Sequence, residues 1–298
     1  MTGTEYLKQV LDQQDLTNEE VAELKRCRTD VEDCLTNEFG NTPSILYAGS
    51  MAKGTMVRES YDLDIVCRFP ESSPETLKDL YDRTYQSLAK AHVVQKKASA
   101  VRVLSLGSAN EKPRDFHVDV VPVHLSDDKT GDGYIYQSSA DRERLKTNLQ
   151  THVDSVRDSK LQDVIKLGKL WRVRNHFPMR TFVLEMLAVR FLGQPGDSLE
   201  SDMIRFLTTC KDNLPTACLV DPANGANVVS NLMTDGEKGL VSTHASQNLD
   251  DLERESEDEG RVRVWRAIML DSLGGGVNNT VAAPQVVVRQ PPKPWSID

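Results

Sequence analysis

The chain has 298 residues, of which 27% are charged and 39% hydrophobic, an ordinary balance for a globular protein with a substantial core. Its formal net charge of −9 argues against long DNA or RNA as the main partner, because such a partner favours a broad basic face. The cysteines are scattered and form no C-x-x-C pair, so neither a disulfide framework nor a zinc ribbon is indicated. No apolar run has membrane-spanning length and the first residues lack a secretion-signal pattern, so we expect a cytoplasmic protein without a membrane partner.

Residues 17–40 have the pattern of a long amphipathic helix. Thr17 and Glu20 have the spacing of a capping box, and apolar residues then recur at helical spacing until Gly40. We expect this helix to brace the core. A second amphipathic pattern, over residues 74–90, predicts a helix that covers a sheet.

A short strand-like segment, residues 44–48, leads to Gly49 and Ser50, which we expect in a turn whose amides and hydroxyl can bind a phosphate. Gly49 and Gly54 also have the spacing of a P-loop. That interpretation fails, because Thr55 stands where the loop requires its phosphate-binding lysine. A plain surface turn is the alternative for an isolated Gly-Ser pair.

Asp62 and Asp64 stand two residues apart in an apolar, strand-like segment. Side chains two apart in a strand point to one face, so the two carboxylates are predicted to lie together while Leu63 and Ile65 face the core. At a separation of about 4 Å and an effective dielectric constant near 20, two such charges repel by roughly 4 kcal/mol. A divalent cation removes that cost, so we predict a Mg²⁺ site beside the phosphate-binding turn.

Asp119 is predicted in the second strand of an antiparallel hairpin, which pairs residues 98–105 with residues 116–125. Alternation in the second strand places Asp119 on the side away from the core, where it can be a third metal ligand. Asp115 has the same parity, but it falls at the turn, where a solvated side chain is expected. Pro122 predicts that strand pairing ends soon after it.

The pattern turns helical from about residue 141, and residues 161–175 carry the strongest local basic cluster of the chain. The cluster consists of Lys166, Lys169, Arg172 and Arg174. In an otherwise acidic chain we expect it to contact a triphosphate. The alternative is a solvated helix face with extended side chains.

Two more helices are predicted near the end of the chain. The first is mostly apolar, with Thr181 as its cap and its end near Gly193. Residues 221–228 have turn composition and predict either an ordered loop near a ligand or a connection between helices. The second helix is expected to stop at the glycines 274–276, and the prolines beyond them predict an extended tail.

The Gly-Ser turn, the strand with Asp62 and Asp64, and the later Asp119 together resemble the nucleotidyltransferases of the polymerase-β superfamily. More narrowly, the chain resembles the cGAS/DncV-like branch, the CD-NTases. These are bacterial relatives of oligoadenylate synthase that make cyclic oligonucleotide signals in antiphage defence (CBASS). The sequence has no Cys/His zinc insertion of the kind found in the animal DNA sensor.

The resemblance also assigns roles to residues outside the aspartates. Lys169 falls on the family lysine that contacts the donor triphosphate. Thr181 and Phe182 stand where the family has serine and tyrosine, which implies a hydroxyl for phosphate and a ring against the donor base. The missing phenol leaves base selectivity open. Residues 221–223 with Asn227 resemble the Asp-Pro-Ala loop of oligoadenylate synthases.

The fold implied by the resemblance is α+β, with a polymerase-β-like nucleotidyltransferase core, a mixed sheet with helices, packed against a C-terminal helical lobe. The expected divisions are residues 1–145 for the brace helix and catalytic lobe, 146–276 for the helical nucleotide-binding lobe, and 277–298 for a flexible Pro-rich tail.

The reaction implied by the resemblance is synthesis of a cyclic di- or trinucleotide from NTPs. Two Mg²⁺ ions, with Mn²⁺ as the alternative, would be held by Asp62, Asp64 and Asp119, and Gly49 and Ser50 would bind the nucleotide. Regulatory or effector proteins of a defence operon are the expected partners. Two alternatives stay open. One is another polymerase-β-type enzyme, which makes linear oligoadenylate, tails tRNA or nucleotidylates a small molecule. The other is a catalytically dead scaffold of the same fold.

Overall fold

The computed structural model describes residues 1–104, 116–138 and 143–271. Within these residues the chain forms two compact units. The sheet unit contains residues 14–162 and 220–227, and the helical unit contains residues 1–13, 163–219 and 228–271. This division differs from the predicted ranges 1–145 and 146–276 at residues 1–13, 146–162 and 220–227. The roles assigned to the two lobes stay predictions.

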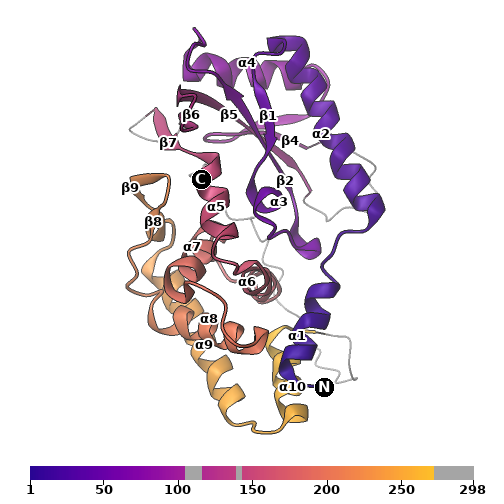
Figure 1. The fold of residues 1–298 in the computed structure, drawn as a ribbon, viewed down its shortest axis with the longest axis vertical. Helices are drawn as coiled ribbons and strands as arrows, with labels where there is room; N and C mark the ends of the chain where they lie inside the picture. The colour runs from indigo at the N-terminus through magenta and orange to yellow at the C-terminus, as the bar shows by residue number, and fades with distance from the viewer. Residues whose placement is uncertain (105–115, 139–142, 272–298) are drawn as a thin grey trace. The chain divides into compact units, whose positions relative to one another are not determined.

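A mixed sheet of seven strands forms the centre of the sheet unit in the described residues (Figure 1). The strand order is β1-β2-β5-β4-β3, with β6 paired to β5 and β7 paired to β6. β2 and β5 run parallel, and the other pairs are antiparallel. The strands are β1 (Ser44–Tyr47), β2 (Leu63–Phe69), β3 (Val94–Lys96), β4 (Val101–Val103), β5 (Val118–Asp127), β6 (Asp132–Tyr136) and β7 (Arg144–Thr147). This arrangement confirms the predicted α+β class.

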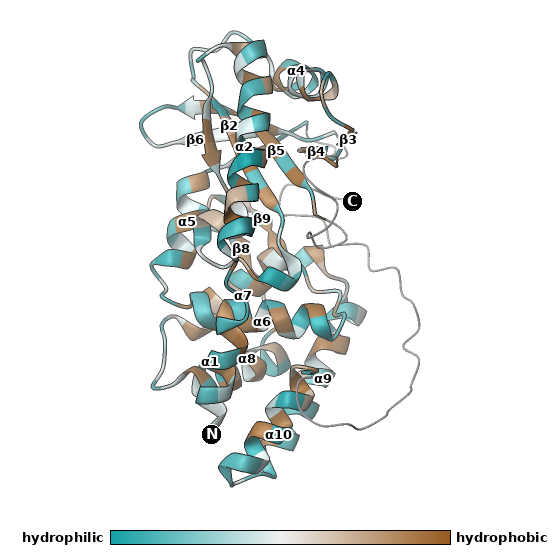
Figure 2. Cartoon of the chain, turned by 90° about the vertical axis from the view of Figure 1, so that its right-hand side faces the viewer, coloured by the Kyte–Doolittle hydropathy of each residue, from teal (hydrophilic) through white to brown (hydrophobic). Residues whose placement is uncertain are grey.

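Helices α2 (Asn18–Phe39) and α4 (Leu77–Ala89) pack on one face of this sheet (Figure 1). Alternate residues of β2 and β5 enter the core beneath them, as the strand periodicity predicts. These residues are Leu63, Ile65, Cys67, Phe69, Val118 and Val120. Figure 2 shows hydrophobic and hydrophilic residues interleaved along α2, which is the pattern of a helix with one buried side.

The predicted boundaries of α2 are confirmed. Thr17 and Glu20 form the capping box, and Gly40, in the left-handed region at φ 65°, ends the helix. Helix α4 begins at Leu77, after its cap Thr76, rather than at residue 74.

The opposite face of the sheet carries shorter elements of the same unit. Helix α3 (Gly49–Lys53) contacts β2 and α5 (Leu149–Arg157), and Leu149 packs against an apolar cluster that includes Val66 and Val121. A short 3₁₀ helix, residues Arg58–Ser60, precedes β2. Gly49 and Ser50 therefore open a short helix, and the predicted turn is wrong.

The expectation that Pro122 ends strand pairing is also wrong. β5 continues to Asp127, and Pro122 lies opposite Cys67 of β2. On its other side β5 pairs with β4 only as far as Val120 and with β6 only from Val123. Pro122 lies where β5 changes partner, so its missing N–H removes no ladder bond on that side.

The prediction that the chain is helical from about residue 141 is wrong at its start. Strand β7 occupies residues 144–147 before α5 begins. The predicted pairing of residues 98–105 with 116–125 is confirmed in β4 and β5, which are antiparallel. The turn between them, with Asp115, lies outside the described residues.

The helical unit is built from α-helices around Trp171. They are α1 (Gly3–Asp12), α6 (Gln162–Arg174), α7 (Thr181–Leu192), α8 (Leu199–Asp212), α9 (Asp235–Glu253) and α10 (Asp258–Ile268), with a 3₁₀ helix at Val229–Leu232. The Trp171 ring lies 4.5 Å from that of Phe177, and its Nε1 donates to Asn248 Oδ1 at 3.0 Å. No helix in the described ranges is long and apolar enough to cross a bilayer.

Two predicted helix ends in this unit are wrong. Thr181 is the first residue of α7, and Arg180 precedes it without a side-chain capping bond. Helix α10 ends at Ile268, where the chain turns through Leu270 in the left-handed region, φ 45°. The glycines 274–276 and the predicted tail lie outside the described residues.

Candidate active site

Asp64 and Asp119 lie side by side on the two parallel strands of the sheet. They are register partners in the β2–β5 pair, and they are only 4% and 1% exposed. Neighbouring strands are about 4.8 Å apart, so two buried carboxylates share one small region of the sheet face. The predicted convergence of these two residues is therefore present, on the face opposite the core of α2 and α4.

Asp62 lies at the edge of this pair, just before β2, and its side chain is 19% exposed. The backbone N–H of Leu63 donates to the His117 carbonyl, so Asp62 and His117 are neighbours across the two strands. His117 Nε2 lies 3.4 Å from Asp62 Oδ2 and 3.6 Å from Asp119 Oδ2. One buried imidazole thus lies between the outer carboxylate and an inner one.

Arg102 contacts Asp119 from the other neighbouring strand. Its Nε donates to Oδ1 at 2.8 Å and its Nη2 donates to Oδ2 at 3.0 Å. Burial lowers the pKa of Arg102, but the hydrogen bonds and charge of Asp119, with the charges of Asp62 and Asp64, raise it above its ordinary value overall. The guanidinium is therefore a permanent positive charge within the acid cluster.

Gly49 leaves room for the Asp64 carboxylate, because it has no Cβ. Its φ of 54° lies in the left-handed region, and a Cβ at this residue would overlap with Asp64 Oδ2. The Ala48 N–H also donates to the Asp64 carbonyl at 2.9 Å. The Gly-Ser segment is thus packed directly against a predicted metal ligand, and Ser50 is the second residue of α3.

The carboxylate oxygens are hard donors of the kind that Mg²⁺ prefers. Among the described residues, no group of three or more His, Cys, Asp or Glu side chains is already arranged to hold a metal ion. The contact with Arg102 accounts for the orientation of Asp119. An ionised carboxylate has about four lone-pair sites, so Asp119 can accept both arginine bonds and still bind a cation. The donor chemistry therefore fits a divalent ion.

The predicted nucleotide-binding residues of the helical unit are largely buried. Lys169 Nζ pairs with Glu185 Oε1 at 2.8 Å, and the two side chains are 5% and 3% exposed. Phe182 is buried one turn before Glu185 on α7, and Thr181 is partly buried. The predicted contacts of Lys169, Thr181 and Phe182 with NTP stay predictions.

The Second Messenger Oligonucleotide or Dinucleotide Synthetase domain matches residues 1–159, more than half of the chain. The chain belongs to this family. The match begins before α2 and extends through α5, so it includes Gly49 and the three aspartates.

Curated relatives of this synthetase-domain protein support the assignment. A CBASS oligonucleotide cyclase CdnC of Escherichia coli (strain KTE188) is 28% identical over 185 residues, which are 55% of this chain and 56% of the relative. A cyclic AMP-AMP-AMP synthase of E. coli (strain MS 115-1) is 26% identical over 227 residues, 63% of this chain and 68% of the relative. The chain thus spans little more than half the length of the CdnC relative.

Solved structures share the fold. E. coli MS115-1 CdnC with ATP has a TM-score of 0.68 at 20% identity, covering 91% of this chain and 99% of that one. Bradyrhizobium diazoefficiens CdnG with GTP has a TM-score of 0.71 at 14% identity, covering 89% and 96%. Vibrio cholerae DncV, a cyclic AMP-GMP synthase, has a TM-score of 0.62 at 16% identity, covering 91% and 85%.

In this synthetase-domain chain the Asp-Pro-Ala loop is a small hairpin of β8 (Val220–Asp221) and β9 (Asn224–Val228). His152 Nε2 lies 2.7 Å from Asp221 Oδ1, and Asn227 Nδ2 donates to Oδ2 at 3.0 Å. Burial would raise the pKa of Asp221, but the hydrogen bonds and the charge of His152 hold it below its ordinary value. The carboxylate therefore fixes the hairpin onto the sheet unit, a role that the sequence analysis left undecided.

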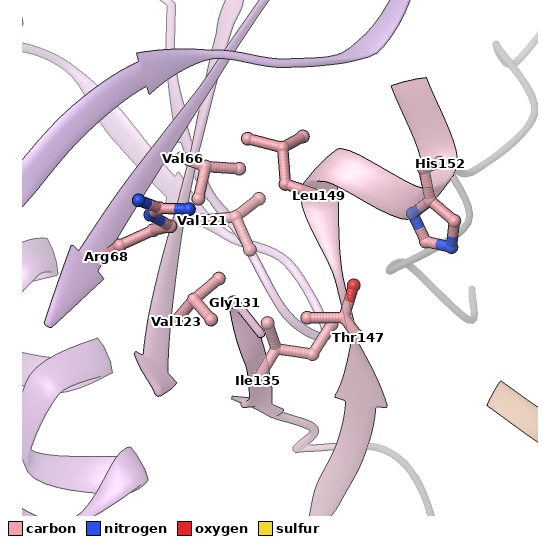
Figure 3. A pocket seen from close by; sticks show the side chains of 9 residues that line it. All are labelled: Val66, Arg68, Val121, Val123, Gly131, Ile135, Thr147, Leu149 and His152. Carbon is pink, nitrogen blue, oxygen red and sulfur yellow. The ribbon is translucent and has the colours of Figure 1, made fainter. Parts of the chain in front are cut away.

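The sheet face becomes apolar directly beyond the aspartates. Val66 and Val121 follow Asp64 and Asp119 by two residues on the same face, and they line a small pocket beside α5 (Figure 3). Arg68 follows Val66 by two residues and also lines it. The acid cluster therefore borders a low-dielectric surface, which strengthens electrostatic interactions on that side.

Sequence reasoning missed Arg102, His117 and Glu185 as partners of predicted site residues. Strand alternation already put His117 on the face of Asp119, so this signal was available. The roles of Arg102 and Glu185 depend on the β4–β5 register and on the packing of α6 with α7, which no local pattern specifies.

Proposed function

We propose that the chain is a nucleotidyltransferase that joins NTPs into a cyclic oligonucleotide. The observation that carries this proposal is the pair of buried, register-matched carboxylates, Asp64 and Asp119, with the Gly49 backbone packed against Asp64. Membership of a synthetase-domain family and relatives named as cyclic nucleotide synthases support it.

In the proposed reaction a ribose hydroxyl oxygen of the acceptor attacks the α-phosphorus of the donor NTP. A new P–O bond forms, the bond to the β-phosphate breaks, pyrophosphate leaves with the negative charge, and the hydroxyl proton passes to solvent water. Asp62, Asp64 and Asp119 would hold two Mg²⁺ ions. When bound, these ions offset phosphate charge and lower the pKa of the attacking hydroxyl.

The side chains of the site have separate tasks in this proposal. Asp119 orients the acceptor side of the site, and Arg102 stabilises its charged form. That contact favours a role for Asp119 as a metal ligand over a role as the acceptor of the hydroxyl proton. Ser50 and Lys169 would neutralise the donor phosphates, and Phe182 would stack on the donor base.

The partner proposals come from the relatives. E. coli CdnC forms a complex with a HORMA protein, so we propose a regulatory protein of this kind as a partner. ATP and GTP, bound by CdnC and CdnG, are the first substrates to test. An antiphage role and a cytoplasmic location belong to the same proposal.

The test is product analysis of the purified chain with all four NTPs and Mg²⁺ or Mn²⁺. We expect phosphatase-resistant cyclic species by mass spectrometry, and digestion with linkage-specific nucleases then identifies the bases and linkages. Phosphatase-sensitive linear products would favour the oligoadenylate or tailing alternative. No product with any NTP, with or without a HORMA-type protein, would favour the inactive scaffold.

A further inference from the structure

Arg102 is fixed against Asp119 by the backbone of the sheet. The two residues are register partners in the antiparallel β4–β5 pair, so the approach of their side chains follows from strand pairing. The arginine side chain is 16% exposed and the aspartate side chain 2% exposed. Both carboxylate oxygens accept a bond from the same planar guanidinium, which sets the plane of the carboxylate as well as its position.

Asp119 also has acidic neighbours, and a constraint on its side chain acts against their repulsion. Asp64 is its register partner on β2, and Asp62 lies near the same His117 ring, whose Nε2 is 3.4 Å from Asp62 Oδ2 and 3.6 Å from Asp119 Oδ2. Like charges at this spacing repel, and a short side chain in a buried site relieves the repulsion by turning away. A positive charge on the far side of Asp119 offsets the repulsion and keeps the carboxylate in place.

We propose that Arg102 is a positioning residue that holds Asp119 in the orientation from which it binds a divalent cation. The use of that cation in nucleotidyl transfer rests on the proposed function, whereas the binding itself does not. A lysine would preserve the charge, but as a point charge it could not hold both oxygens.

The opposite role has a different signature. If the guanidinium competed with the cation for Asp119, its removal would tighten metal binding. If it positions Asp119, its removal weakens metal binding, because groups that hydrogen-bond to a metal ligand typically contribute about 10- to 100-fold to metal affinity. The direction of the change therefore separates the two roles.

The experiment is a Mn²⁺ titration of the nucleotide-free protein, followed by the electron paramagnetic resonance signal of free Mn²⁺. We expect Arg102→Gln to bind Mn²⁺ about 10- to 100-fold more weakly than the wild type. Arg68→Gln is the matched control, because Arg68 is a partly buried arginine of the same sheet that makes no hydrogen bond or ion pair with the aspartates among the described residues. Its affinity should equal that of the wild type.

Arg102→Lys keeps the test decisive if Arg102→Gln does not fold, because it retains the charge beside buried Asp119. We expect it to bind Mn²⁺ several-fold more weakly than the wild type and to lower kcat with little change in the KM for NTP. Equal or tighter Mn²⁺ binding in either folded variant would overturn the proposal, and so would a wild type that binds no Mn²⁺. A wild type that binds Mn²⁺ but makes no product would refute the proposed function alone.

Discussion

Both units of the molecule contain a buried ion pair that involves a predicted site residue, but the two pairs differ in their surroundings. In the helical unit, Lys169 and Glu185 are both nearly inaccessible and oppose one positive charge to one negative charge. In the sheet unit, Arg102 faces Asp119 within a group that also contains Asp62 and Asp64. The first pair joins one base to one acid, whereas in the second one arginine faces a group of three aspartates.

The comparison teaches where an added cation can stabilise the protein. A cation near the sheet cluster lowers the repulsion between carboxylates that Arg102 only partly offsets. A cation near Lys169 gains nothing, because Glu185 is already paired. We therefore expect divalent ions to stabilise the sheet unit. The helical unit should be stabilised by a phosphate only if the Lys169 ammonium can contact the phosphate and Glu185 at the same time.

The strongest test of the comparison removes two of the three aspartates. Asp62→Ala with Asp64→Ala should abolish nucleotide transfer and the rise in Tm caused by Mg²⁺, because both effects require the ligands. Without Mg²⁺ the Tm should stay unchanged or rise, since like-charge repulsion is relieved. Product formation and Tm with Mg²⁺ or EDTA are the measurements.

Asp12→Ala with Asp15→Ala is the matched control, because both side chains are exposed acids far from the cluster in sequence. This control should keep its activity and its Mg²⁺ response. Full activity in the Asp62/Asp64 double variant would contradict the site assignment.

Gly49→Ala tests whether the position of Asp64 matters without removing a charge. A Cβ would overlap with Asp64 Oδ2, and displacing a reacting group by about 1 Å can lower the rate by about 100-fold. Gly54→Ala is the control: its φ of 71° causes similar backbone strain, but its nearest neighbour, Gln162 Cγ, is 4.0 Å away. Gly54→Ala should lose roughly 1–2 kcal/mol of stability from backbone strain, and Gly49→Ala should lose more because Asp64 must also move. Equal activity of the two variants would show that the contact with Asp64 is irrelevant.

Lys169→Ala breaks the buried ion pair and removes the ammonium that lies 2.8 Å from the Glu185 carboxylate. Such a change typically costs roughly 3–5 kcal/mol of unfolding free energy. The double variant Lys169→Met with Glu185→Leu should recover most of this loss, and Lys166→Ala, on a more exposed part of α6, should change stability by less than about 0.5 kcal/mol. Denaturant unfolding of the three variants measures these differences.

The same double variant separates the two roles of Lys169. If its ammonium contacts the donor triphosphate, the KM for NTP stays raised in the double variant although stability returns. A wild-type KM in that variant would make Lys169 purely structural, contrary to our proposal.

The local patterns of the sequence were sufficient to predict the acid cluster but not the residues that contact it. Alternation around Asp64 and Asp119 decided which face each carboxylate occupies, because the strand period of two holds wherever one face is buried. The same kind of rule failed at Pro122, because its effect depends on which strand lies beside it. Arg102 is separated from Asp119 by 17 positions, so only the register of two strands brings them together.

The smallest expected effect concerns the hairpin of β8 and β9. Asp221→Asn keeps the shape of the side chain and removes the charge that binds His152 Nε2, so the wild type should be more stable by about 1–3 kcal/mol near pH 6.

The pKa of Asp221 is lowered in the folded chain, while an unfolded aspartate titrates near about 3.9. A carboxyl group of this kind contributes its full stability above the unfolded pKa and loses it as the pH falls through the lower, folded pKa. The difference in stability between wild type and Asp221→Asn should therefore be larger at pH 5 than at pH 3 and shrink as the pH falls below about 4. Denaturant unfolding from pH 3 to 7 measures it, with Asp12→Asn as the exposed control. A difference that grows as the pH falls from 5 to 3 would mean that the charge of Asp221 does not hold the hairpin.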